Sequence, residues 1–295
     1  DETVEIQTLA TDGAGDLLVT GSMTGEVRVI PVDGSPIRLL EGFNSQVLSA
    51  TITTDGRFVA GAGGQFVPEE AVIRIWDLAG EEETRVLDAR DGLFIRDLQF
   101  TPDGNLVSSG PGGVRLWNVA DGSSQLVREG VVWGHAIRPD GGAILSSAGV
   151  APAEVQIYDL ASGAATSLPE HGPQVYTLAF DATGQRAVSV DFSGVVRVAP
   201  TAGGAAHHLV GPPSALWDVA TDAAGRWIAA AGASGEIRLW LMPDGATPPM
   251  SLSTEEFLSM LRGTTNLRVG PDPATPTGYR LDVTPTGGWA GSGDE

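Results

Sequence analysis

The side chains that could carry acid–base, nucleophilic or metal chemistry are few in this sequence. It contains four histidines and no cysteine, so thiolate nucleophiles, thiolate metal sites and disulfides are excluded. His207 and His208 are adjacent, and adjacent residues of a strand point to opposite faces, so this pair cannot chelate one ion. We therefore interpret the pair as exposed or capping residues rather than as a metal site.

Acidic residues are plentiful, but they form no recognisable catalytic pattern. The run Glu81–Glu83 falls in a loop between two expected strands and is typical of a solvated face. The sequence has no Gly-x-Ser-x-Gly elbow, His-Glu-x-x-His motif, Walker loop or EF-hand loop. The glycine-rich segment Gly110–Gly113 leads into a strand, so it lacks the helix N-terminus that would hold a phosphate. The sequence therefore predicts no catalytic residue, no metal site and no cofactor, although two loop acids could still meet over a channel.

The composition favours a globular fold rich in short strands, with an acidic surface. The chain has 295 residues, of which 42% are hydrophobic and 18% charged, and it contains 40 glycines and 19 prolines, a content that suits strands joined by turns. Every basic residue is arginine, which together with the abundant alanine and glycine indicates a GC-rich bacterial genome. A net charge of −20 would repel phosphate backbones and anionic membranes, so we expect neither nucleic acid nor membrane as a partner.

A repeat of 41 residues organises the chain. One apolar–polar–apolar strand motif recurs six times, with its central residue at positions 28, 74, 115, 156, 197 and 238. The steps between these positions are 46, 41, 41, 41 and 41 residues, and the insertion 65–70 explains the longer first step. Turn dipeptides such as Asp55-Gly56 and Asp103-Gly104 keep the same phase. Such regular spacing is typical of a repeat architecture.

Each repeat predicts four strands in the same order. In the third repeat the expected strands cover Ile95–Phe100, Leu106–Ser109, Val114–Asn118 and Gln125–Arg128. Their apolar and polar residues alternate, and glycine-containing turns separate them, as expected for β-strands. A period of about 40–45 residues with four strands is typical of one blade of a β-propeller.

The chain resembles the WD-repeat family in three segments: Ile73–Asp77 with its Trp-Asp ending, Phe100–Gly104 and Ser189–Arg197. The resemblance covers about residues 4–250 and implies an all-β fold, a WD-repeat β-propeller with six four-stranded blades. Two features depart from the family. Its Gly-His dipeptide is mostly missing, since Gly134-His135 falls inside an expected strand, and its tight-turn aspartate is clear only at Asp191.

The six expected blades cover about residues 5–42, 46–88, 92–129, 131–169, 174–210 and 214–250. The segment that follows departs from the repeat. Ser253–Glu256 predicts the start of a helix, and Asn266–Val269 and Tyr279–Val283 predict two strands. We expect residues 251–290 to be a closing module, whose helix and hairpin form a partial seventh blade or a plug, and residues 291–295 to be disordered. This tail resembles the segment that closes WD-repeat regions in bacterial multidomain signalling proteins.

One position of the repeat defines a candidate binding surface. When the repeats are aligned on their turns, the residue after the first apolar position of the first strand is Gln7, Leu48, Arg96, Trp133, Tyr176 or Trp217. The resemblance implies that this column faces the channel mouth, where the WD-repeat family grips peptides, and that Phe66 and Phe192 open on the same face. Tryptophan, tyrosine and arginine are enriched at binding hot spots, so we predict a partner-binding site. The alternative is that Trp133 and Trp217 are core residues wedged between blades.

The sequence therefore predicts a chain that is not an enzyme but a scaffold for a protein or peptide, which the charge of −20 suggests is basic. The resemblance implies the sensing or docking domain of a larger bacterial signalling or effector protein, so other domains of a parent chain are candidate partners. The alternative is a small-ligand-binding or hydrolytic propeller with its site over the channel. Because the chain begins at Asp1 and has no signal-peptide pattern, we expect a fragment, a processed product or an excised domain. The expected location is the cytoplasm.

Overall fold

The computed structural model describes residues 5–64, 67, 71–80, 84–89, 94–149, 153–168, 174–210, 214–243, 267–271 and 279–283. The chain divides into two compact units, Asp1–Pro243 and Asp244–Glu295. Every regular element among the described residues is a β-strand, which confirms the predicted all-β class. A search of this part of the chain finds no helix of the length and hydropathy needed to span a membrane.

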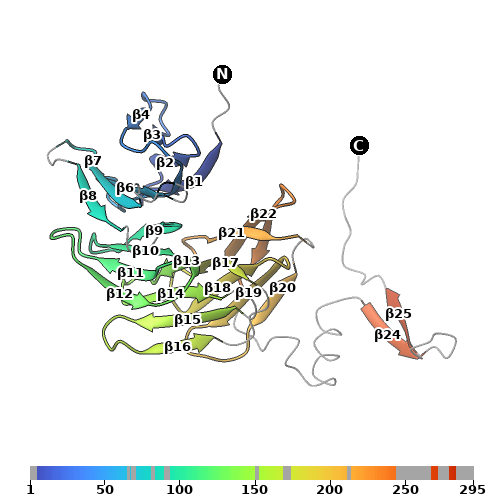
Figure 1. Ribbon diagram of the computed structural model, residues 1–295. Helices are drawn as coiled ribbons and strands as arrows, with labels where there is room; N and C mark the ends of the chain where they lie inside the picture. Colours follow the sequence, from blue (N-terminus) through green and yellow to red (C-terminus); the bar gives the residue numbers. More distant parts are fainter. Residues whose placement is uncertain are drawn as a thin grey trace, which may run out of the picture. The chain divides into compact units, whose positions relative to one another are not determined.

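The first unit contains six antiparallel sheets, each built from strands that are consecutive in the sequence (Figure 1). Blade one consists of β1 (Ile6–Thr11), β2 (Leu17–Ser22), β3 (Val27–Pro31) and β4 (Arg38–Leu40). Blade two consists of β5 (Val47–Ile52), β6 (Phe58–Gly63), β7 (Val72–Asp77) and β8 (Arg85–Asp88). Blade three consists of β9 (Asp97–Phe100), β10 (Leu106–Gly110), β11 (Gly113–Trp117) and β12 (Ser124–Arg128).

The remaining three blades follow the same plan. Blade four consists of β13 (Val132–Ile137), β14 (Ala143–Ala148), β15 (Glu154–Asp159) and β16 (Ala165–Leu168). Blade five consists of β17 (Val175–Phe180), β18 (Arg186–Asp191), β19 (Val195–Pro200) and β20 (His207–Val210). Blade six shows three strands within the described residues, β21 (Leu216–Thr221), β22 (Trp227–Gly232) and β23 (Ile237–Leu241).

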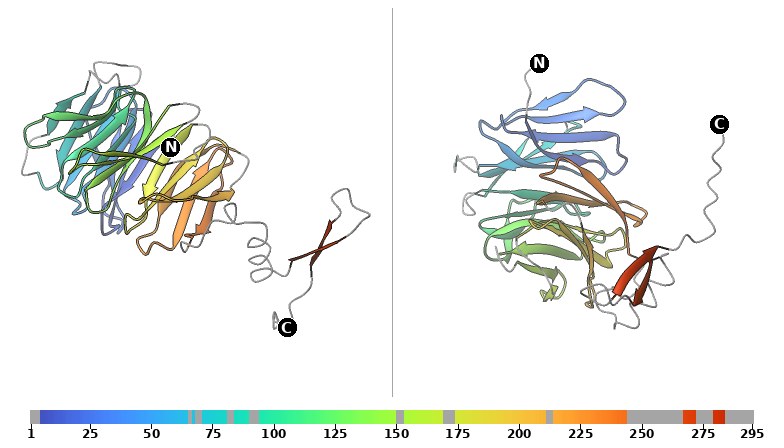
Figure 2. Two further views of the ribbon diagram at one scale, coloured as in Figure 1. Left: turned by 90° about the horizontal axis from the view of Figure 1, so that it is seen from below. Right: turned by 90° about the vertical axis from the view of Figure 1, so that its right-hand side faces the viewer.

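The first strand of each blade is the inner strand, and the other strands follow it outward. The six inner strands contribute to one central channel. Figure 2 shows the blades following one another in sequence order, from the blue first blade to the orange sixth. Successive inner strands, from β1 and β5 to β17 and β21, lie against each other. The repeated sequence therefore places one equivalent residue from each blade at each level of the channel.

Apolar side chains between neighbouring blades form the core. Five clusters of buried residues fill the five interfaces between successive blades. Between blades three and four, for example, Val107 and Val114 pack with Val132 and Ile144, and all four side chains are buried. The middle strands are consequently buried on both faces, which explains why β6 and β10 lack the polar–apolar alternation of a half-exposed strand.

The outward face of blade six is an exception to this burial. On β23, Ile237 and Leu239 are 76% and 65% exposed, and Leu241 shares their face with Trp227, its partner on β22. Leu9, on the inner strand of blade one, is also exposed. Within the described residues no buried cluster joins blade six to blade one. The six blades therefore leave a large apolar surface at the end of the series, an arrangement that is uncommon in soluble monomers.

The sequence-based prediction of six blades is confirmed, and the predicted third strands agree with the structure to within one or two residues. Blade six differs, because its fourth strand would fall after Pro243, outside the described residues. In the second unit, β24 (Leu267–Pro271) and β25 (Tyr279–Val283) pair in antiparallel fashion, as predicted for the hairpin. The predicted helix and the tail 291–295 lie outside the described residues, and the closing role of residues 251–290 stays a prediction.

The exposed face of blade six can be tested with an apolar fluorescent dye. In a fragment that ends at Pro243, replacing Ile237 and Leu239 by serine should lower dye binding, because these side chains make up much of the open apolar surface. Serine at the exposed Leu126 of blade three is the control and should leave dye binding unchanged. Equal dye binding by all variants would contradict an open face. If residues 251–290 close the propeller, the full chain should bind less dye than the fragment.

Candidate binding site at the channel mouth

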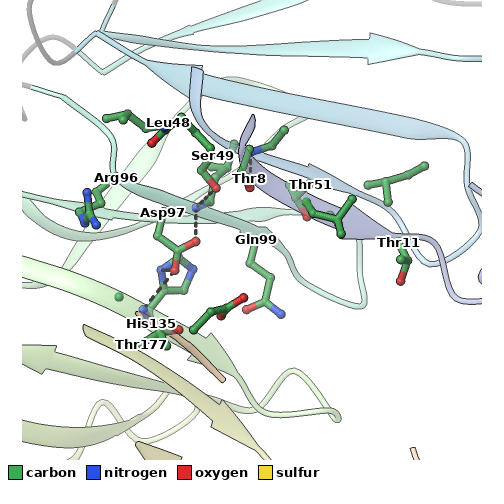
Figure 3. A pocket seen from close by; sticks show the side chains of 18 of the residues that line it. Thr8, Thr11, Leu48, Ser49, Thr51, Arg96, Asp97, Gln99, His135 and Thr177 are labelled. Atoms are coloured by element: carbon green, nitrogen blue, oxygen red, sulfur yellow. Dashed lines mark hydrogen bonds and ion pairs between the residues drawn. The ribbon is translucent and has the colours of Figure 1, made fainter. Parts of the chain in front are cut away.

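A central channel with a volume of about 1000 Å³ runs between the inner strands of the six blades. Figure 3 shows part of its lining, in which Thr8 of β1, Ser49 of β5 and Asp97 of β9 come from equivalent positions of successive repeats. Thr177 of β17 and Asp218 of β21 occupy the same position in blades five and six. The channel is thus the place where the repeat brings one set of side chains together.

The inner strands carry a β-bulge near their first residues. In five blades the register between the first and second strands shifts at this point. The bulge residues are Gln7, Leu48, Tyr176 and Trp217, and in blade four the pair Trp133-Gly134. A bulge leaves its extra residue outside the strand ladder and redirects its side chain. The predicted column therefore coincides with the residues that the bulges release from pairing.

Arg96 is the column residue of blade three, where the pairing of β9 with β10 shows no register shift. It lies just before β9, and its backbone N–H donates to the carbonyl oxygen of Ser109 on β10 at 2.9 Å. This bond ties Arg96 to the neighbouring strand while its side chain remains outside the ladder. All six residues of the column line the channel.

The exposure of the column residues argues against a purely structural role. Trp217 is 52% exposed, and Trp133 is half-buried, so neither is a core residue enclosed between blades. Gln7 is also exposed, and the remaining column residues are half-buried. Phe192 lies exposed in the turn between β18 and β19. Phe66 lies outside the described residues, so its expected place at the mouth stays a prediction.

Four of these residues contact one another, and we call them the mouth cluster: Arg96, Trp133, Tyr176 and Phe192. The rings of Trp133 and Tyr176 are stacked, with centroids 6.0 Å apart and planes inclined by 15°. The guanidinium carbon of Arg96 lies 5.3 Å from the Trp133 centroid and 4.6 Å from that of Tyr176, within the range of cation–π attraction. Phe192 adds a third ring, 5.6 Å from Tyr176. The cluster spans three successive blades.

The turn that carries Phe192 is held by a buried carboxylate. Asp191 accepts hydrogen bonds from the backbone N–H and the hydroxyl of Ser193, at 2.9 and 2.6 Å, and from the guanidinium of Arg197. Burial alone would raise the pKa of Asp191, but the hydrogen bonds of Ser193 and Arg197 and the arginine charge lower it. Asp191 is therefore an ionised anchor, and it presents Phe192 to the cluster on a fixed turn.

Below the mouth, side chains of one inner strand bind the backbone of the next. The residue after the column position accepts a hydrogen bond from an N–H of the following blade: Thr8 from Ala50 at 3.4 Å, Ser49 from Leu98 at 3.0 Å, and Asp97 from His135 at 3.3 Å. We call these contacts the inter-blade hydrogen bonds. They satisfy backbone donors that a gap between sheets would otherwise leave unpaired. They also hold neighbouring column residues at fixed separations.

Asp97, His135 and Ser109 lie together, but they do not form a catalytic triad. The Nδ1 atom of His135 lies 3.2 Å from a carboxylate oxygen of Asp97 and 3.0 Å from the hydroxyl of Ser109. In a triad the acid and the nucleophile contact opposite ring nitrogens, whereas both partners here share one. The side chain of His135 is fully buried, and Ser109 is buried as well. This arrangement joins blades three and four rather than exposing a nucleophile.

Asp97 and Asp218 differ in how their charges are compensated. Burial would raise the pKa of Asp97, but the charge and hydrogen bonds of His135 outweigh it and lower the pKa. Asp218 is open to the channel, and it accepts a hydrogen bond only from the N–H of its neighbour Val219, at 2.9 Å, among the contacts described. Its pKa is raised, because the channel walls withdraw the carboxylate from bulk water and Asp97 adds negative charge.

Reasoning from the sequence located the column but missed the polar residues beneath it. Asp97 and His135 each lie next to or close to a column residue, so the repeat alignment held a usable signal. Their pairing depends on how far β9 and β13 are shifted relative to each other along the channel. The spacing of residues within one repeat does not predict this shift. Within blade three, the Trp117 indole also donates to the Ser108 hydroxyl at 2.8 Å, and both residues are buried.

Comparison with known families agrees with this architecture. The model of the WD domain, G-beta repeat, matches residues 81–118 and 204–240. Each match runs from the outer strand of one blade through the first three strands of the next, from β8 to β11 and from β20 to β23. A search of curated proteins finds no match to the chain.

The raised pKa of Asp218 makes a prediction about stability and pH. An acid whose pKa is higher in the folded state destabilises that state when it is ionised. Asp218→Asn should therefore raise the Tm at pH 7. This gain should disappear as the pH falls through the raised pKa, because the wild-type carboxyl then becomes neutral. Thermal melts between pH 3 and pH 7 would measure the effect.

The control for this experiment is an acid with the opposite shift. The pKa of Asp222 is lowered, chiefly by the hydrogen bond from the Trp227 N–H and also by that from Arg226. Asp222→Asn should therefore lower the Tm at pH 7, and its effect should fade at low pH. A lower Tm of Asp218→Asn at pH 7 would contradict the conclusion that the ionised Asp218 carboxylate destabilises the folded state.

Proposed function

Because the chain is a WD-repeat β-propeller, we propose that it is a non-catalytic scaffold whose protein or peptide partner binds at the channel mouth. The observation that carries this proposal is the mouth cluster, in which Arg96 and three aromatic side chains from three successive blades meet beside an open channel. Residues of these types dominate the energetics of many protein interfaces.

The construction of the site supports recognition by a preformed surface. Tyr176 and Trp217 are bulge residues of regular strands, and Phe192 lies on a turn anchored by Asp191. Aromatic side chains also have few rotatable bonds, so little conformational entropy is lost when a partner covers them. A partner would thus meet side chains already held near their bound positions.

The charge of the chain favours a partner with a basic surface. A net charge of −20 attracts positively charged molecules over long distances, and salt screens this attraction. We further propose that the chain serves as a sensing or docking domain of a larger bacterial signalling protein in the cytoplasm, with other domains of a parent chain among the candidate partners. The support for this finer proposal is the resemblance of its sequence to such WD-repeat regions.

A second candidate is a small-ligand-binding or hydrolytic propeller with its site over the channel. Asp97 and Asp218 favour it, since two carboxylates near each other inside a channel could divide acid and base roles. The burial of His135 and the engagement of Asp97 with it count against this candidate, because neither imidazole nitrogen is open to a substrate. The mouth cluster therefore supports partner binding more directly than the acids support catalysis.

The proposed binding site predicts a selective effect of aromatic substitutions. Trp217→Ala and Tyr176→Ala should each weaken partner binding by about 2 kcal/mol or more, as expected for hot-spot anchors. The matched control is Trp227→Ala, which removes an indole of similar exposure, 42%, from a strand that does not line the channel. Partners isolated by pull-down with the full chain would be titrated against each variant by calorimetry.

The result would distinguish the candidate functions. Equal losses in the Trp217 and Trp227 variants would place the partner on another surface. Raising the salt from low to physiological concentration should weaken binding to all variants by a similar factor, because the long-range attraction comes from the whole charge of the chain. Turnover of a small substrate that Asp218→Asn abolishes would instead support the second candidate.

A further inference from the structure

Arg96 has no acid partner among the described residues, although the chain is strongly acidic. Within the part of the chain that the structure describes, no carboxylate lies within ion-pair distance of its guanidinium, and no hydrogen bond from its side chain is present. Six other arginines do pair with acids: Arg28, Arg57, Arg128, Arg138, Arg197 and Arg238. Arg96 instead rests on aromatic rings at the mouth of a channel. Its charge is therefore available to a ligand.

The nearest carboxylate in the sequence does not take this role. Asp97 uses one oxygen for both the backbone N–H and the ring Nδ1 of His135, at 3.3 and 3.2 Å. In Figure 3 dashed lines connect Asp97 with His135, and none leads to the side chain of Arg96. The two adjacent residues thus have different partners: Asp97 contacts His135, whereas Arg96 contacts Trp133 and Tyr176. Asp97 holds the scaffold together, and Arg96 faces the mouth.

The surroundings of Arg96 also hold its guanidinium in place. Its guanidinium carbon contacts the rings of both Trp133 and Tyr176. Rings that contact the guanidinium through cation–π attraction leave N–H donors free, because these donors lie in the guanidinium plane. Since Arg96 is only half-buried, those donors can be reached from solvent. A preoriented fork of N–H donors is suited to a planar anion that binds through two oxygens.

The charge of the channel selects among such anions. Asp97 and Asp218 lie in the lining of the same channel as Arg96, so the local field opposes a ligand with two negative charges. A phosphate group carries about −1.5 to −2 charges at pH 7, and it is tetrahedral. A carboxylate carries a single charge and is planar, so it matches one guanidinium with less repulsion from the two aspartates.

We propose that Arg96 is the anchor for a carboxylate of the partner, either an acidic side chain or the free C-terminus of a peptide. This inference rests on the proposed function, since it specifies which group of the partner enters the mouth. Trp133 and Tyr176 position the guanidinium, and the exposed indole of Trp217 offers apolar contact to neighbouring residues of the peptide. A basic partner would then carry one acidic residue at its contact with the mouth.

The test uses random peptides selected for binding to the full chain. Each selected peptide would be synthesised in three forms: with its acidic residue, with the corresponding amide residue, and with an amidated C-terminus. Fluorescence polarisation at low salt would give the Kd of each form. We expect replacement of the recognised carboxylate by an amide to weaken binding about tenfold or more, as expected for a charge-assisted pair. Sensitivity to the side-chain amide or to C-terminal amidation identifies the source of the carboxylate.

Variants of the protein then show whether Arg96 is the receptor. In Arg96→Gln the difference between acid and amide peptides should shrink to less than about twofold, and Arg96→Lys should retain part of it, since lysine keeps the charge but loses the planar fork. The control is Arg226→Gln, which removes the same charge from the turn between β21 and β22 and should leave the tenfold difference intact. Circular dichroism would verify that the variants fold.

The outcomes distinguish a failure of this inference from a failure of the proposed function. Suppose that Trp217→Ala abolishes peptide binding, but that Arg96→Gln leaves the difference in Kd between acid and amide peptides unchanged. This result would overturn the inference about Arg96 and leave the proposed function standing. A phosphoserine form that binds more tightly than the acidic form would overturn the preference for a carboxylate. If no peptide is selected, or if selected peptides bind Trp217→Ala as well as the wild type, both proposals fail.

Discussion

The inter-blade hydrogen bonds at the channel wall are the constraint on which the binding surface depends. Apolar contacts hold neighbouring blades together, but the hydrophobic effect behind them is not directional. Bonds from Thr8, Ser49 and Asp97 to the next inner strand are directional, so they fix how high each blade sits against its neighbour. The bond between Asp97 and His135 sets blade three against blade four, which is where Arg96 contacts Trp133.

Blade four shows how strictly this packing is set, because its equivalent residue is Gly134. A Cβ at this position would lie 2.6 Å from the carbonyl oxygen of Tyr176 on the next blade. The backbones of β13 and β17 therefore approach too closely for a side chain between them, and glycine replaces the hydrogen bond with direct contact. The same approach brings Trp133, the preceding residue, onto the ring of Tyr176. One small residue thus helps to create the aromatic stack.

Much of the architecture could be predicted from the sequence, because repetition converts one strand pattern into six. The arginine-containing third strands and the column from Gln7 to Trp217 both follow from the 41-residue phase. The contacts of Arg96 could not be predicted, since they depend on the bulges and on the spacing between blades. A bulge adds a residue without a distinctive sequence, as Leu48 and Tyr176 show. The pairing of Asp97 with His135 likewise joins residues 38 positions apart through tertiary geometry alone.

The bulges also separate the residues that determine binding chemistry from the residues that hold the fold together. A bulge residue such as Trp217 or Leu48 is left out of the strand pairing, whereas the residue after it pairs with the second strand of the blade and lines the channel. Selection can therefore change the chemistry of the mouth one residue at a time while the fold persists. A lineage that duplicates such a chain could acquire a new binding preference through few mutations, because the scaffold would need no compensating change.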